Sequence, residues 1–291
     1  MKKKTRSSYQ FLLTLLAIIS LVLFSEIFIL KVSVLSTNHW IKTTTQSNYA
    51  QKLTATINRS IQDLGLGSGI SAGGLKDVIT EEQVTTDFDL FLENTLNATP
   101  YLVDQEAVKD SISLAIADYS KKENKPINKE NKSSIDQFID RSYQIYDQAI
   151  RNKFISIFGL RVHQIDQFIL YALFGSFFLL IILLILIYTS CDGYRHVFFR
   201  NLSYLFSSSS LLIFFTSFLV YQYNPIKTLS IFDDNLNNWL FEGLKQPQIF
   251  NLIISLIFFI VGVGLSLFSY KEYIQLEQRN FRREKKQQRI W

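Results

Sequence analysis

The stretch FILYALFGSFFLLIILLILIY, residues Phe168–Tyr188, contains no charged side chain over its whole length. A helix of about 20 apolar residues spans the roughly 30 Å hydrocarbon core of a bilayer. Because lipid offers no hydrogen-bond partner to an exposed backbone, such a stretch is expected to be helical. It therefore predicts a transmembrane helix.

Three further apolar runs of similar length occur at Phe11–Leu30, Leu202–Tyr221 and Ile249–Ser269. The predicted fold class is an all-α membrane protein, with four transmembrane helices and a helical-bundle extracytoplasmic domain between the first and the second. The first run follows a basic start, and no A-x-A-like cleavage site comes after it. We therefore expect an uncleaved signal anchor.

These runs divide the chain into alternating polar and apolar segments. The expected division is a cytoplasmic N-terminus (1–10), transmembrane helix 1 (11–35), an extracytoplasmic helical domain (36–160), transmembrane helix 2 (161–188), a cytoplasmic loop (189–201), transmembrane helix 3 (202–222), an outer loop with an interfacial amphipathic helix (223–248), transmembrane helix 4 (249–270) and a basic cytoplasmic tail (271–291).

The distribution of basic residues predicts the side of the membrane on which each segment lies. The N-terminus, the 189–201 loop and the tail hold thirteen Lys and Arg against four Asp and Glu, whereas segment 31–167 holds fifteen against seventeen. Lys and Arg accumulate in short cytoplasmic segments. We therefore expect a multi-pass protein of the cell membrane with both termini in the cytoplasm. The net charge of +5 reflects this topology and does not indicate a nucleic-acid partner.

The segment outside the membrane lacks cysteine, and the chain is rich in Lys, Asn, Ile and Phe. A secreted eukaryotic domain of this size is more often cross-linked by disulfides. The composition therefore favours a bacterial cell envelope.

Within this segment, apolar residues repeat at helical spacing. Leu53, Ile57 and Ile61 predict a helix that continues outward from the first membrane span. Thr80 and Asp104 are expected to cap two more helices. Ser133 or Ser134 opens a fourth, and Gly159 is expected to separate it from the second span.

A glycine-rich stretch, LGLGSGISAGGLKDVITEEQ (Leu64–Gln83), interrupts this pattern. A phosphate-binding loop requires GxxxxGK[ST] or GxGxxG between a strand and a helix, and this stretch follows a predicted helix and lacks the lysine. We interpret it as a connection between helices, with Gly65 as the C-cap and positive φ at Gly67 and Gly69.

The outer loop contains an amphipathic stretch, SIFDDNLNNWLFEGL, which Ser230 is expected to cap and Pro247 to end. It predicts a short helix that lies at the outer interface or packs beneath the bundle. As a candidate interaction surface it offers Phe232, Asp233, Asp234, Trp239 and Glu242.

Ionisable residues near the membrane form two more candidate sites. Glu26 lies inside the first apolar run, close to Lys31, and either reaches the outer interface or forms an intramembrane polar site. The basic tail is a candidate for binding anionic lipid headgroups. Its candidate residues are Arg279, Arg282, Arg283, Lys285 and Lys286.

No motif of a known enzyme mechanism stands out, and no cofactor is predicted. His39, His163 and Asp166 lack the spacing of a metal site. Cys191 has no catalytic partner nearby in the sequence and is interpreted as a passive thiol. Residues of small size at Gly262, Ser266 and Ser207–Ser210 favour close helix packing within the bundle over dimerisation, although a homo-oligomer stays open.

These features favour a non-enzymatic envelope protein whose extracytoplasmic helical module binds a protein partner. Two alternatives stay open. The layout is similar to that of the cell-division and related permeases that a separate ATPase serves, which implies a transport subunit, although their outer domains have α/β elements that are not predicted here. The other alternative is a membrane enzyme that acts on lipid or wall precursors.

Overall fold

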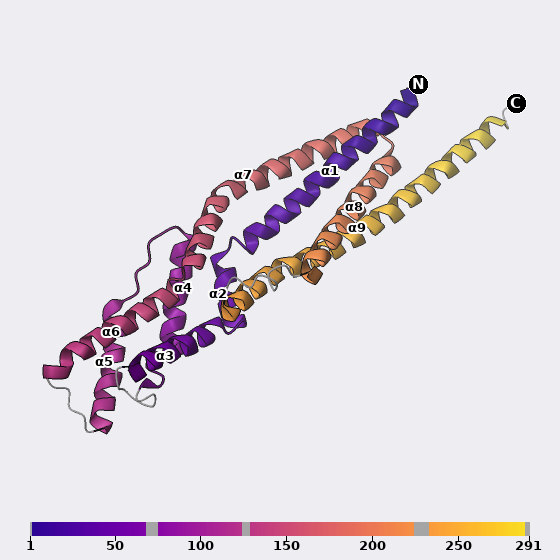
Figure 1. Ribbon diagram of the computed structural model, residues 1–291. Coiled ribbons are helices and arrows are strands. Elements are labelled where there is room, and N and C mark those ends of the chain that lie inside the picture. Colours follow the sequence, from indigo (N-terminus) through magenta and orange to yellow (C-terminus); the bar gives the residue numbers. More distant parts are fainter. Residues whose placement is uncertain (1, 68–74, 124–128, 224–232, 289–291) are drawn as a thin grey trace. The chain divides into compact units, whose positions relative to one another are not determined.

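The computed structural model describes residues 2–67, 75–123, 129–223 and 233–288. Within these ranges the chain is α-helical apart from short connections, and no β-strand is present. The helices are α1 (Lys2–Val32), α2 (Thr37–Gln46), α3 (Tyr49–Gly67), α4 (Glu81–Leu96), α5 (Gln105–Lys122), α6 (Lys129–Ile150), α7 (Lys153–Ser190), α8 (Arg195–Tyr223) and α9 (Asp234–Gln288) (Figure 1). The predicted all-helical class is confirmed.

The chain forms two compact units. Unit 1 comprises Met1–Ser33, Phe168–Pro225 and Leu244–Trp291, and unit 2 comprises Val34–Gln167 and Ile226–Gly243. Helices α7 and α9 each contribute residues to both units.

Unit 1 contains the apolar runs. Among the described residues, four helices are long and apolar enough to cross a membrane. Their outward side chains are large and apolar, as with Phe168 and Tyr171, which are 70% and 77% exposed. Exposing so large an apolar surface to water is unfavourable, whereas exposing it to the hydrocarbon of a bilayer is not. Unit 1 thus has the properties of a multi-pass membrane protein.

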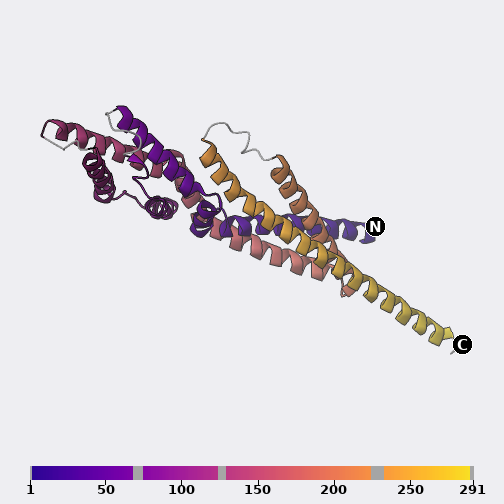
Figure 2. The same ribbon diagram turned by 90° about the horizontal axis from the view of Figure 1, so that it is seen from below.

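Polar side chains fix how the helices of unit 1 are aligned. Gln10 Nε2 near the start of α1 donates to the carbonyl of Ser190 at the end of α7, at 2.8 Å, and Ser20 donates to Ser176 O at 3.1 Å. These pairs require α1 and α7 to be antiparallel. The start of α1 and the end of α9 lie at the same end of unit 1 (Figures 1 and 2).

Small residues bring α8 and α9 together. A Cβ atom added at Gly262 would lie 2.4 Å from Ser207 Oγ, and the Ser203 hydroxyl donates to Gly262 O at 2.9 Å. Ser210 likewise donates to Ser255 O at 2.7 Å. Close approach at glycine and serine is the usual way in which helices associate in lipid. The predicted use of these residues for packing inside the bundle is confirmed.

Unit 2 is a helical domain with its own core. The largest fully buried side chains include Trp40, Tyr49, Phe88, Tyr146 and Trp239. The predicted caps of α4 and α5 are confirmed, because Thr80 Oγ1 accepts from Gln83 N at 3.2 Å and Asp104 Oδ1 accepts from Glu106 N at 3.1 Å.

Two predicted boundaries near the first membrane helix were wrong. The first helix does not continue outward, because α1 ends at Val32, and α2 and α3 are separated near Asn48, whose φ is 52°. Nor does Gly65 end a helix, since it is buried inside α3. Gly69 lies outside the described residues. Local turns that reorient a helix leave apolar spacing intact on either side, so periodicity does not reveal them.

The boundary expected at Gly159 was also wrong. Gly159 lies inside α7, and the break comes earlier, at Asn152, whose side chain accepts from Phe154 N at 2.9 Å. Gly159 instead permits close packing, because a Cβ there would lie 2.3 Å from Thr95 Cγ2.

The stretch around Trp239 differs from its prediction at both ends. Asp233 caps α9, accepting from Asn235 N at 2.7 Å and Leu236 N at 2.9 Å, whereas Ser230 lies outside the described residues. Pro247 lies inside α9 and does not end it. A proline has no backbone N–H to donate to the carbonyl four residues earlier. Here a side chain bonds to that carbonyl, which belongs to Gly243.

Candidate functional site

The first turns of α9, residues 234–243, are part of the core of unit 2. The Trp239 side chain is fully buried, and its Nε1 donates to Thr44 Oγ1 at 3.1 Å. Its ring centroid lies 4.7 Å from that of Trp40, 5.8 Å from that of Tyr49 and 6.2 Å from that of Phe88. Trp239 is therefore a core residue, and its predicted place on an exposed interaction surface was wrong. An amphipathic pattern identifies an apolar face, but not the partner that covers it.

Gly243 of α9 also packs against α2, through Trp40 and His39. A Cβ added at Gly243 would lie 2.3 Å from an atom of the buried Trp40 ring. His39 Nε2 lies 2.8 Å from Gly243 O, the carbonyl to which residue 247 would donate in an uninterrupted helix. Because Pro247 has no N–H, the imidazole supplies the missing hydrogen bond.

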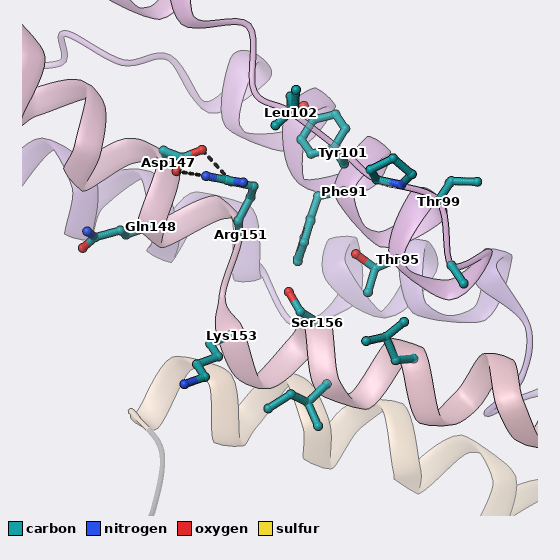
Figure 3. Close-up of a pocket in the computed structure, with 14 residues that line it drawn as sticks. Phe91, Thr95, Thr99, Tyr101, Leu102, Asp147, Gln148, Arg151, Lys153 and Ser156 are labelled. Carbon is teal, nitrogen blue, oxygen red and sulfur yellow. Dashed lines mark hydrogen bonds and ion pairs between the residues drawn. The ribbon is translucent and has the colours of Figure 1, made fainter.

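A cleft of about 690 Å³ lies in unit 2, where α6 ends, α7 begins and the connection from α4 to α5 passes (Figure 3). Phe91 and Thr95 of α4 contribute to its wall. Leu102, Ile157 and Leu160 line it while remaining 78%, 51% and 50% exposed. The cleft therefore has large, exposed apolar side chains in its wall.

Basic residues line one side of the cleft. Arg151 forms a bidentate pair with Asp147, in which Nε donates to Oδ1 at 2.6 Å and a second guanidinium nitrogen contacts Oδ2 (Figure 3). Lys153 is exposed and forms no ion pair with any described residue. Since Asp147 neutralises Arg151, Lys153 leaves the cleft with a positive charge beside its apolar wall.

A half-buried carboxylate connects Tyr101, which lines the cleft, to α6. Asp87 of α4 accepts hydrogen bonds from Tyr146 of α6 at 2.6 Å and from Tyr101 of the α4–α5 connection at 3.1 Å. Burial, and after it the charge of Asp87, raises the pKa of Tyr101 well above its ordinary value of 10.0. Burial, and after it the charge of Asp233, also raises the pKa of Tyr49.

These tyrosines predict a loss of stability in alkali. A phenol whose pKa is raised by folding stabilises the fold fully below the unfolded pKa, and this contribution is lost as the pH rises above that value. Above pH 10 the free energy of unfolding should fall by about 1.4 kcal/mol per pH unit for the buried Tyr49, and by less for the more exposed Tyr101. Tyr49→Phe should reduce the slope by about one such increment, measured by denaturant unfolding over a pH series. An identical slope in the variant would contradict this assignment.

The remaining predicted site residues are placed as follows. Glu26 accepts a hydrogen bond from Asn251 Nδ2 of α9 at 3.1 Å, and Lys31 lies in the last turn of α1. Asp233 and Asp234 are exposed, Glu242 is half-buried, and Phe232 lies outside the described residues. In the tail, Arg279 is exposed. The side chains of Arg282, Arg283, Lys285 and Lys286 lie outside the described part of the chain.

The histidines contribute to packing and are not brought together as a metal site. His163 Nδ1 lies 3.2 Å from Leu96 O, and His39 contacts Gly243. Throughout the described ranges, no three His, Cys, Asp or Glu side chains are grouped in a way that could hold a metal ion.

Comparisons of the chain with family models, curated proteins and solved structures found no match. The class of protein is therefore defined by the fold, as a helical protein with four candidate membrane spans among its described residues. The cleft was not predicted from the sequence. Its walls come from segments about fifty residues apart, and neither segment carries a motif.

Proposed function

We propose that this chain is a non-enzymatic, multi-pass protein of the bacterial cell membrane, whose unit 2 lies outside the cytoplasm and binds an envelope protein through the cleft. The single observation that carries the proposal is the combination, around one cavity, of exposed Leu102, Ile157 and Leu160 with Lys153, which forms no ion pair with a described residue. Exposed apolar patches rimmed by polar groups are typical of interaction sites.

The lining of the cleft suggests what the partner presents. A surface with large exposed aliphatic side chains is stabilised when a partner's apolar side chain covers it. Lys153 favours a carboxylate next to that side chain, and such rim charges mainly govern the rate of association and the choice of partner. The partner segment therefore combines an apolar residue with an acidic one.

The membrane topology of the proposal is supported by the distribution of Lys and Arg. It agrees with the alignment of unit 1, in which the start of α1 and the end of α9 share one end (Figure 1). In the sequence, unit 2 follows the end of α1 at Val32, and its second segment precedes the Ile249–Ser269 run of α9.

A photo-crosslinking amino acid at Ile157 of the full-length protein, expressed in its native cell, tests the proposal. We expect a discrete crosslinked protein, and we expect Lys153→Glu to reduce its yield about five-fold or more, since a reversed charge opposes an acidic partner by about 1 kcal/mol or more. Lys76→Glu is the matched control, because Lys76 is exposed and does not line the cleft.

A crosslinker at Leu114 provides the second control, since this residue is 67% exposed and lies outside the cleft. If the same products form from Ile157 and Leu114, or if Lys153→Glu and Lys76→Glu behave alike, the cleft is not the binding site and the proposal is wrong.

A further inference from the structure

A second cavity, independent of the cleft, lies inside unit 1. It is a groove of about 380 Å³ between α1 and α8. The residues from α1 are Gln10, Phe11, Thr14, Leu15 and Ile18, and those from α8 are Arg200, Asn201, Tyr204 and Ser208. Each set advances by eight residues along one helix face, so the groove follows the two helices for about two turns, or roughly 12 Å.

The groove begins at the level where each helix enters its apolar run. Gln10 directly precedes the run Phe11–Leu30, and Arg200 lies two residues before the run Leu202–Tyr221. In a helix that crosses a bilayer, the start of the apolar run lies at the boundary between the headgroups and the hydrocarbon. Arg200 is therefore placed at the depth of the lipid phosphates.

Arg200 has a charge that no described residue neutralises. Its side chain is exposed, and no ion pair or hydrogen bond connects it to a described carboxylate. At this depth an Arg side chain reaches the headgroup region, and the groups available there to pair with it are the lipid headgroups. Guanidinium groups bind phosphate oxygens in a bidentate manner, which makes a phosphate the complementary partner.

The rest of the groove is suited to a hydrocarbon chain. Phe11 is 71% exposed and Leu15 is 41% exposed, and Tyr204 faces them from α8 with 55% exposure. Deeper along the groove, the Ile18 side chain is only 8% exposed. The groove thus has a cationic group at one end and, between polar residues such as Thr14 and Ser208, apolar side chains along its length. This arrangement suits a lipid with an acidic headgroup.

We propose that this groove binds one acidic phospholipid of the leaflet at the start of α1, with its phosphate at Arg200 and one acyl chain along Phe11, Leu15 and Tyr204. In the topology proposed above this is the cytoplasmic leaflet, where anionic lipids attract basic residues. The site is distinct from the basic tail, because its cation lies in α8 and its walls are formed by two membrane helices.

The test measures which lipid stays with the full-length protein. The protein is reconstituted into vesicles with equal amounts of phosphatidylglycerol and phosphatidylcholine, extracted in mild detergent, and its retained lipids are counted by native mass spectrometry. We expect one phosphatidylglycerol to be retained preferentially. Arg200→Gln should reduce its retention about five-fold, which corresponds to about 1 kcal/mol for one basic group near an anionic surface.

Arg195→Gln is the matched control. It removes the same charge from the same helix five residues earlier, where the side chain is exposed and does not line the groove. Arg195→Gln should retain phosphatidylglycerol as the unmodified protein does, and Arg200→Lys should retain more of it than Arg200→Gln.

Three results would overturn the proposal. Equal retention of the two lipids would mean that the groove holds ordinary surrounding lipid only. Equal losses in Arg200→Gln and Arg195→Gln would mean that general surface charge attracts the lipid. Complete displacement of the lipid by inorganic phosphate would assign the site to a free anion.

Discussion

Replacing Trp239 with alanine is expected to lower the free energy of unfolding of unit 2 by about 3–5 kcal/mol, the range for truncation of a buried Trp or Phe. The side chain is fully buried, lies against Trp40, Tyr49 and Phe88, and donates a hydrogen bond to Thr44. Its loss leaves a cavity in the core and removes the contacts that residues 234–243 make through the Trp239 side chain. The variant should show faster hydrogen exchange across α2, α3 and α4 in the full-length protein.

Asn238→Ala is the control for this change. Asn238 precedes Trp239 on the same helix and is only half-buried, so its truncation should change the stability by about 0.5 kcal/mol or less. If Trp239→Ala leaves exchange in α2, α3 and α4 as slow as Asn238→Ala does, residues 234–243 are not part of the core of unit 2.

Replacing Gly243 with valine is the second large effect, with an expected cost of about 1–3 kcal/mol or more from overpacking. The first added carbon would lie 2.3 Å from the Trp40 ring. Because Trp40 is fully buried, neighbouring side chains prevent its ring from moving aside. The change would also move the Gly243 carbonyl away from His39 Nε2, now 2.8 Å away, and so weaken the hydrogen bond between them. A thermal unfolding curve of the full-length protein measures the loss.

Gly264→Ala provides a control of opposite sign. Gly264 lies in the same helix, and a Cβ added there meets nothing within 4 Å. Because alanine is favoured over glycine in a helix interior by about 1 kcal/mol, this variant should be as stable as the original or slightly more stable. Equal destabilisation by Gly243→Ala and Gly264→Ala would contradict the role assigned to the contact with Trp40.

The sequence predicted those parts of the fold that depend on neighbouring residues. The four apolar runs became four long helices, and the caps at Thr80 and Asp104 lie where the capping pattern placed them. The small residues around Gly262 pack inside the bundle as expected. Each of these signals acts over a few residues, or over one helix face, and can therefore be recognised without knowledge of the tertiary structure.

The errors arose where a residue type has two uses. Gly159 and Pro247 are typical of helix ends, yet both lie inside helices. Gly159 is required by the close approach of Thr95, and Pro247 is tolerated because His39 binds the carbonyl that the proline leaves without a donor. Both reasons come from residues far away in the sequence, so a local pattern assigns these positions incorrectly.

By itself, the sequence determined that this is a helical protein with four candidate membrane spans, because helix formation and transfer into lipid depend on the composition of about twenty consecutive residues. Only the tertiary structure decided that Trp239 belongs to a core formed mainly by residues 34–167. It alone also decided that Lys153 lines a cleft with Leu102, and that Arg200 lines a groove with Phe11. These juxtapositions join residues that are 51 to 199 positions apart, and they form because each helix buries its apolar face against whichever complementary surface the folded chain supplies.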